Sequence, residues 1–259
     1  RLGLSPAALL ADKPSLIYCN LGAFGLRGPM RAAPGYDPLV QAFGGLMSIQ
    51  GEEGGRPNRV GVSIIDMSTG MWAVIAILAA LREVEQTGCG GVIDTSLFES
   101  CLSWMSVPIA SFLASGELPT RCGSGVAHVV PYEALEASDG FIMIAAGNDK
   151  LFRRLVQALE LGPLADDSRY QTNADRVSNR APLIEILSTR IRQMTVGEWS
   201  AKLDAVGVPN GPVQTLDQVL AHEQTRALEI IQDGPNGTLP TVGLPISFDG
   251  KRPQFERAA

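Results

Sequence analysis

The side chain best placed to do chemistry in this sequence is the carboxylate of Asp66, which follows an apolar, β-branched run and precedes a strongly helical segment. This arrangement predicts a strand-to-helix junction with the aspartate at the N-terminus of the helix. The helix dipole and the amides there favour a charged, nucleophilic carboxylate and could stabilise an oxyanion formed beside it. A commoner reason for an aspartate at such a junction is helix N-capping, and the residues alone leave both interpretations open.

Two apolar runs and one long helix are expected to position this aspartate. Residues 14–21 predict a buried strand that feeds a glycine-rich loop, and residues 60–65 predict a second strand that ends at Asp66. A helix is predicted at 67–85, and its apolar residues lie nearly all round it, which indicates packing on several sides.

The next segment repeats the same order of elements. Val92 and Ile93 predict a short strand, and Asp94 is expected to cap a helix that runs through Trp104 until Pro108 interferes. Strand, helix, strand and helix in succession indicate an α/β fold built from parallel-sheet units.

A stretch rich in Gly, Ser, Pro and Thr at 115–127 predicts a linker between two domains. We expect 1–114 to form the part of a large domain that holds the candidate site, 128–214 to form a small α+β domain, and 215–259 to return toward the large domain.

Two further predictions fall in the small domain. They are an antiparallel hairpin of 129–135 with 141–146, and helices near 151–161, 181–194 and 198–206, the last with a Thr195–Glu198 capping box and a stop at Gly207.

Composition excludes several classes of protein. With 21 Lys and Arg against 27 Asp and Glu, the net charge is −6 and no basic run stands out, so nucleic acid is not an expected partner. The 4 cysteines are widely spaced, with no CxxC pair and no nearby histidine, and predict neither a metal site nor disulfides. The longest apolar run, 71–81, is well short of the roughly 20 residues of a membrane-spanning helix, so no membrane is expected. A cytoplasmic, globular protein fits these features.

Four segments, taken in order, resemble the class III coenzyme A transferases of the formyl-CoA and carnitine type. They are LIYCNLGAFGLRGP at 16–29, PGYDPLVQAFGGLMSIQGE at 34–52, VGVSIIDMSTGMWAVIAILAAL at 60–81 and TGCGGVIDTSLFES at 87–100. Shorter matches follow at 147–149, 166–170 and 207–213. The order and spacing of these segments carry the resemblance, which covers nearly the whole chain.

The resemblance implies an interlocked homodimer with a Rossmann-like large domain, built from both chain ends, and a smaller α+β domain from the middle. Members of the family carry a long segment before the position of Arg1 and a further stretch after that of Ala259. We therefore expect this chain to be truncated at both ends.

By its match to the family, Asp66 is the nucleophile that carries the acyl group and then CoA, with no metal and no permanently bound cofactor. Tyr36 stands where these transferases have an aromatic residue that lines the active site, although packing with its hydroxyl on a partner would also explain it. Asp37 and Gln41 lie beside Tyr36 and either shape the acyl pocket or form structural hydrogen bonds.

Other residues are assigned to CoA binding through the same resemblance. Gly22 and Gly25 would let CoA approach the backbone, although glycines at this spacing also serve turns. Arg31 and Arg27 are candidates for the nucleotide phosphates, because guanidinium suits phosphate geometry, whereas a lone surface arginine is usually solvated.

The resemblance thus predicts transfer of CoA between carboxylic acids through a covalent aspartyl intermediate, with acyl-CoA and carboxylic acids as substrates. One alternative is an acyl-CoA racemase of the same superfamily, which has a histidine for proton transfer where Tyr36 stands; neither His128 nor His222 lies there. Another is a non-catalytic, truncated remnant that acts as an interaction module. A dinucleotide-dependent oxidoreductase is set aside because no GxGxxG follows a strand with the required acidic residue.

Overall fold

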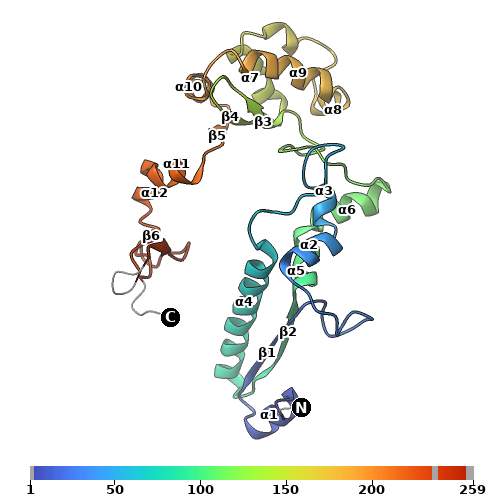
Figure 1. Cartoon of the computed structure of the whole chain (residues 1–259), viewed down its shortest axis with the longest axis vertical. Helices are drawn as coiled ribbons and strands as arrows, with labels where there is room; N and C mark the ends of the chain where they lie inside the picture. The colour runs from blue at the N-terminus through green and yellow to red at the C-terminus, as the bar shows by residue number, and fades with distance from the viewer. Residues whose placement is uncertain (1–2, 235–238, 255–259) are drawn as a thin grey trace. The chain divides into compact units, whose positions relative to one another are not determined.

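A computed structural model describes residues 3–234 and 239–254, which fall into two compact units. The first unit comprises Arg1–Glu133 with Thr172–Arg180, and the second comprises Ala134–Gln171 with Ala181–Ala259. Figure 1 labels the helices and strands of both. The predicted linker at 115–127 and the predicted return segment at 215–259 stay predictions.

A parallel pair of strands, β1 (Ile17–Gly22) and β2 (Gly91–Ser96), forms the sheet of the first unit (Figure 1). Ile17 pairs with Gly91 and Gly22 with Ser96, so both strands end at the same edge. Helix α4 (Ile64–Thr87) lies between them in the sequence and contacts both. This arrangement confirms the α/β prediction and the two strands expected at 14–21 and 92–93. A short helix, α1 (Pro6–Asp12), precedes β1.

Helix α4 begins earlier than predicted, and the strand predicted at 60–65 is wrong. Ser63 is the N-cap, Ile64 and Ile65 already belong to the helix, and residues 60–63 form no strand. The β-branched residues of this run have a strand propensity, but tertiary contacts override such a propensity. Here Ile65 is fully buried in the core, and its N–H is bound by the carboxylate of Asp37.

Two helices follow β2, namely α5 (Leu97–Trp104) and α6 (Ser106–Ser115). The predicted cap at Asp94 is wrong, because Asp94 lies within β2 and the buried hydroxyl of Ser96 accepts the capping bond from the N–H of Glu99. Pro108 does not end a helix either. It lies in the first turn of α6, where a helix tolerates proline because the N–H that proline lacks has no partner within the helix.

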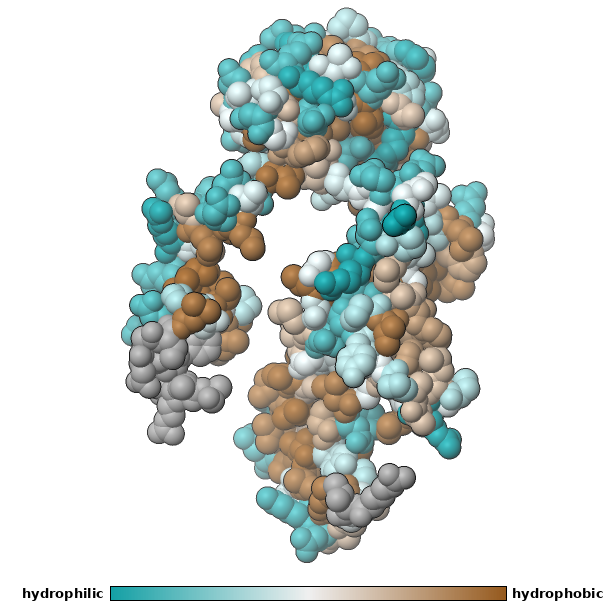
Figure 2. Space-filling model, in the orientation of Figure 1, coloured by the Kyte–Doolittle hydropathy of each residue, from teal (hydrophilic) through white to brown (hydrophobic). Residues whose placement is uncertain are grey.

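The expectation that α4 is packed on several sides is wrong for the described chain. Its buried residues, Ile65, Ser68, Thr69 and Ala73, all lie in its first half. Large apolar side chains are exposed along it: Met67, Met71, Trp72, Val74, Ile75, Leu78 and Leu81. Figure 2 shows hydrophobic, brown surface in the region of this helix. By length and composition α4 could cross a membrane, as could α5 and α6 taken together despite their 63° bend, but helices from protein cores pass the same test.

Helices α2 (Asp37–Phe43) and α3 (Leu46–Ile49) complete the core of the first unit. One cluster of buried apolar side chains joins α2, α3, α4 and α5; it consists of Val40, Leu46, Ile65, Leu97, Cys101 and Met105. The rings of Phe24, Phe43 and Phe98 pack together nearby, with centroids 5.2–5.9 Å apart. The first turn of α4 is therefore held in the apolar core of this unit through Ile65.

The second unit is built on a sheet with the strand order β3 (Tyr132–Glu136), β4 (Phe141–Ala145) and β5 (Asn210–Pro212). Strands β3 and β4 are neighbours joined by a tight turn, as the hairpin prediction requires. The capping box of Thr195 with Glu198 is confirmed, and Gly207 follows that helix with a φ of +66°. The remaining elements are α7 (Asp149–Ala158), η1 (Gly162–Ala165), α8 (Asn173–Ser178, in the first unit), α9 (Arg180–Ile191), α10 (Val196–Ala205), α11 (Leu216–Ala221), α12 (Glu223–Ala227), β6 (Ile231–Gln232) and β7 (Thr241–Val242).

Candidate active site

The start of α4 is capped by a carboxylate from another helix. Ser63, at the N-cap position, makes no side-chain cap. Instead Asp37, the first residue of α2, accepts hydrogen bonds at Oδ2 from the N–H groups of Ile65 (2.8 Å) and Asp66 (3.2 Å). The first N–H groups of a helix have no partner within the helix, and Asp37 provides one from 28 residues away in the sequence.

Asp66 is therefore not the cap of its helix. It is the third residue of α4, and its side chain is exposed. Within the described ranges, no residue forms a hydrogen bond or an ion pair with its carboxylate. The N-capping interpretation is wrong, and Asp66 presents an unengaged carboxylate at a helix end where the dipole favours negative charge.

The amides at this helix start do not offer the oxyanion site that was expected. The N–H groups of residues 64–67 all have acceptors. That of Ile64 binds the carbonyl oxygen of Val62, and that of Met67 binds the carbonyl oxygen of Ser63. Those of Ile65 and Asp66 bind the carboxylate of Asp37. An N–H group that is already bound is not available to a developing oxyanion. Any oxyanion formed at Asp66 needs donors from elsewhere.

Tyr36 is connected to Asp66 only through its neighbour in the sequence, Asp37. It is the extended N-cap residue of α2, and the next residue, Asp37, binds the N–H of Asp66. The Tyr36 side chain is 71% exposed, so the packing interpretation does not account for it. An exposed phenol suits contact with a ligand better than it suits a structural role.

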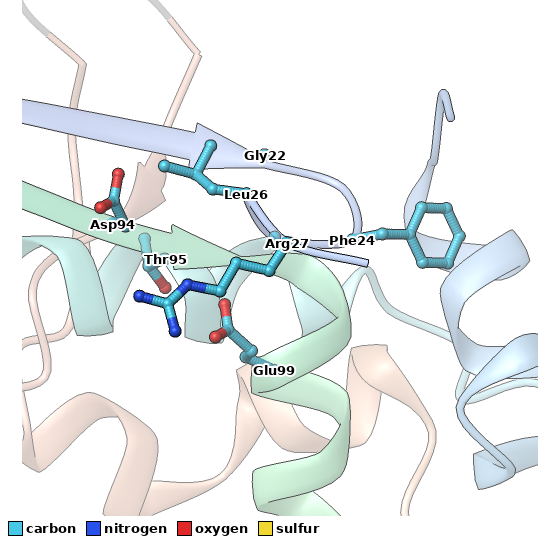
Figure 3. Close-up of a pocket in the computed structure, with 8 residues that line it drawn as sticks. Gly22, Phe24, Leu26, Arg27, Asp94, Thr95 and Glu99 are labelled. Carbon is cyan, nitrogen blue, oxygen red and sulfur yellow. The ribbon is translucent and has the colours of Figure 1, made fainter. Parts of the chain in front are cut away.

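A pocket of about 420 Å³ opens at the edge where β1 and β2 end (Figure 3). Ligands of open α/β sheets bind at the carboxyl ends of the strands, which is where this pocket lies. Its lining contains both predicted glycines, Gly22 and Gly25, and Gly25 has a φ of +87°, which favours glycine. The complete lining is Gly22, Phe24, Gly25, Leu26, Arg27, Asp94, Thr95 and Glu99.

Of the two arginines considered for phosphates, the pocket holds Arg27 and not Arg31. In Figure 3 the guanidinium of Arg27 extends over the pocket toward Thr95 and Glu99. Arg31 is an exposed loop residue, and its backbone N–H binds the carbonyl oxygen of Gly28. Asp66 and Tyr36 are not part of this lining, so the structure does not gather all the predicted residues into one pocket.

The thiols make no site of their own in the described part of the chain. All 4 cysteines are free, and burial raises the pKa of both the Cys101 and the Cys122 thiol. The described residues also contain no group of three His, Cys, Asp or Glu side chains that could hold a metal ion.

Comparison with known proteins agrees with the resemblance read from the motifs. The sequence model described as CoA-transferase family III matches residues 1–259. This chain belongs to CoA-transferase family III. Succinate–glutarate CoA-transferase of Agrobacterium fabrum is 35% identical over 260 residues, 99% of this chain and 65% of that protein. Human succinyl-CoA:glutarate CoA-transferase is 35% identical over 232 residues, 90% of this chain and 53% of that protein.

A solved member of the family confirms the fold class. The crystal structure of a CaiB/BaiF family protein from Brucella suis superposes with a TM-score of 0.82 at 39% identity, over 96% of this chain and 66% of that one. The chain thus spans between half and about two thirds of the length of the relatives it matches. The Agrobacterium and human relatives are named CoA-transferases, and the racemase alternative is not favoured.

Sequence reasoning missed several residues of the pocket at the ends of β1 and β2. Asp94, Thr95 and Glu99 line the pocket; the available signal was the position of Asp94 and Thr95 directly after a predicted parallel strand, and Glu99 lies in the first turn of the helix that follows. For Asp37 and Gln41 the sequence leaves two interpretations open, and the structure shows these side chains hydrogen-bonded to each other and to backbone N–H groups. Structural hydrogen bonding is the role that their geometry displays.

Proposed function

We propose that this protein transfers CoA from an acyl-CoA to a carboxylic acid through a covalent intermediate on Asp66. The observation that carries the proposal is the exposed, unengaged carboxylate of Asp66 at a helix start whose backbone is fixed by Asp37, in a chain that belongs to CoA-transferase family III. A carboxylate that is already hydrogen-bonded or paired would be a poorer nucleophile, because attack would first have to break those bonds.

In the proposed reaction, one Asp66 oxygen attacks the thioester carbonyl of the donor, and CoA leaves as its thiolate. The product is a mixed anhydride of the donor acid with Asp66. The thiolate then attacks the Asp66 carbonyl, which releases the donor carboxylate and leaves CoA bound to Asp66 as a thioester. The acceptor carboxylate reverses these steps: it displaces the thiolate to form a second anhydride, whose acceptor carbonyl the thiolate attacks, and this regenerates the Asp66 carboxylate. No net oxidation, water or metal is needed.

The remaining predicted residues are proposed to bind the substrates. Tyr36 would contact the acyl group; the support is that its side chain is exposed and that it immediately precedes the residue that binds the Asp66 N–H. Gly22 and Gly25 would admit CoA to the backbone at the pocket edge, and Arg27, which lines that pocket, would serve a phosphate better than the predicted Arg31. CoA enters this scheme as a substrate, and the scheme requires no permanently bound cofactor.

The substrate class we propose is that of short dicarboxylic acids. The support is the names of the two relatives, both of which pair succinate or succinyl-CoA with glutarate. The test therefore uses succinyl-CoA and glutaryl-CoA as donors, with succinate and glutarate as acceptors, and acetyl-CoA with acetate for comparison.

The proposal predicts that incubation with a donor thioester alone will label Asp66. Intact-mass analysis should show an adduct with the mass of CoA less water, and hydroxylamine should convert it to a hydroxamate that maps to the peptide containing Asp66. Glu85→Ala is the matched control for the specificity of labelling at Asp66, because Glu85 is another exposed carboxylate on α4, in its last turn. Labelling should persist in this control. A folded wild-type protein that forms no adduct with any of the three thioesters would contradict the proposal.

We also propose that the protein is a homodimer. Family membership supports this, as does the run of exposed apolar side chains along α4, because large contiguous apolar surfaces usually mark an interface. Light scattering coupled to size-exclusion chromatography should give twice the mass of one chain. A variant with Val74 and Leu78 both replaced by glutamate, two exposed residues of α4, should give the mass of one chain. A wild-type mass equal to one chain at micromolar concentration would contradict the dimer.

A further inference from the structure

A buried carboxylate, that of Asp37, binds the backbone N–H of the proposed nucleophile, Asp66. Asp37 is 2% exposed, and three donors reach it: the N–H groups of Ile65 at 2.8 Å and Asp66 at 3.2 Å, and Nε2 of Gln41 at 2.6 Å. Within the described ranges no Lys or Arg forms an ion pair with it. A buried carboxylate is tolerated only when hydrogen bonds replace its hydration, so the three bonds hold Asp37 and its donors to one geometry.

Gln41 extends this contact to the segment before the helix. It is fully buried, one turn along α2 from Asp37, and uses both ends of its amide. Nε2 donates to Oδ1 of Asp37, and Oε1 accepts the N–H of Val60 at 2.9 Å. Through these two side chains, α2 is bonded both to the segment that enters α4 and to the first turn of α4.

The peptide unit that joins Ile65 to Asp66 is held at both of its ends. Its N–H, that of Asp66, binds Asp37. Its carbonyl oxygen, that of Ile65, accepts hydrogen bonds from the hydroxyls of Thr69 at 2.7 Å and Ser68 at 3.1 Å. Thr69 and Ser68 are themselves buried. The backbone from which the Asp66 side chain projects thus has little freedom to move.

We propose that Asp37 is a positioning residue for the reaction: its carboxylate, oriented by Gln41, fixes the backbone of Asp66 so that the nucleophile meets the thioester carbonyl at the correct distance and angle. The inference rests on the function proposed above. It assigns Asp37 no contact with the substrate. Misplacement of a reacting group by about 1 Å lowers a rate by about 100-fold, so a loss of this size in kcat is the expected consequence of removing the carboxylate.

In the Asp37–Gln41 pair, Gln41 donates and Asp37 accepts. Exchanging donor and acceptor between the two positions gives a test in which the hydrogen bonds are broken and then restored. Asp37→Asn places an amide N–H₂ against Nε2 of Gln41, so one of the bonds is lost whichever way the amides turn. Gln41→Glu places two carboxylates together. In the double variant, the carbonyl oxygen of the new amide at position 37 would accept the N–H groups of Ile65 and Asp66. Its N–H₂ would donate to the new carboxylate at position 41, which would still accept the N–H of Val60. This double variant therefore preserves the pattern of bonds.

The measurements are kcat and KM for succinyl-CoA:glutarate transfer, and hydrogen exchange of the peptide that spans residues 60–67. We expect each single variant to lower kcat by about 100-fold, with KM for the thioester changed by less than about 3-fold, and to speed exchange of that peptide. The double variant should recover kcat to within about 10-fold of wild type and restore slow exchange. Thr195→Ala, which removes a capping box in the second unit, controls for general loss of stability and should leave kcat unchanged.

The outcomes separate this inference from the proposed function. If wild-type protein forms no Asp66 adduct, the function fails, while the exchange data still report whether Asp37 fixes the helix start. If the adduct forms and the single variants keep kcat within about 3-fold of wild type, Asp37 does not position the nucleophile. A folded double variant with slow exchange but unrecovered kcat would also overturn the inference, because the bonds would then be present without their effect. If a single variant does not fold, kcat and hydrogen exchange of the double variant, compared with those of wild type, still test whether the restored bonds are accompanied by a restored rate.

Discussion

Replacing Asp66 with asparagine will lower the rate of CoA transfer by at least about 1,000-fold and leave the fold intact. Asparagine keeps the size and shape of the side chain but lacks the anionic oxygen that forms the anhydride. Because no described residue bonds the Asp66 carboxylate, its removal should change the free energy of unfolding by less than about 1 kcal/mol. Initial rates with succinyl-CoA and glutarate, together with urea unfolding followed by circular dichroism, measure the two effects on the same preparations.

Asp66→Glu is the matched control for position. It retains the carboxylate but moves it by one methylene group, so adduct formation should persist while kcat falls by about 100-fold. The two variants together separate the need for a nucleophile from the need for its placement. Transfer by Asp66→Asn within about 10-fold of wild type would assign the covalent step to another residue, and hydroxamate mapping in that variant would identify it.

Local signals in the sequence predicted the elements whose formation depends on near neighbours. The Thr195–Glu198 capping box, the hairpin turn between β3 and β4 and the apolar runs of β1 and β2 each rely on contacts within a few residues or on simple burial. The strand predicted at 60–65 failed for the opposite reason. A partner 28 residues away, Asp37, binds the amides that begin the helix there, and no local pattern encodes that contact.

The same distinction applies to the candidate site. The family motif was sufficient to choose Asp66, but the choice between cap and unengaged carboxylate depended on where Asp37 lies in space. Arg27 and Arg31 are both candidate phosphate ligands in the sequence, and Arg31 was the predicted one. Only the path of the intervening loop, which passes through the positive φ of Gly28 (+84°), places Arg27 at the pocket and Arg31 away from it.

In the second unit, replacing Trp199 with alanine will lower the free energy of unfolding by about 3–5 kcal/mol. The indole is fully buried, and its Nε1 donates a 2.7 Å hydrogen bond to the carbonyl oxygen of Ile191. Arg190 and Lys202 place their cationic groups 5.6 and 5.5 Å from the ring centroid. The alanine variant would leave a large cavity and two cations without their aromatic face, and the Ile191 carbonyl oxygen would keep only the N–H of Met194, at 3.4 Å, as a donor. Urea unfolding followed by circular dichroism measures the loss.

Trp199→Phe separates the volume of the ring from its hydrogen bond. Phenylalanine fills most of the cavity and keeps an aromatic face for the two cations, but cannot donate to Ile191, so a loss of about 1–2 kcal/mol is expected. Because the chain forms two compact units, we expect two unfolding transitions, and the effect should appear as a shift of one transition while the other keeps its midpoint. If alanine and phenylalanine destabilise equally, the hydrogen bond dominates and the cavity argument is wrong; if both transitions shift together, the two units unfold as one.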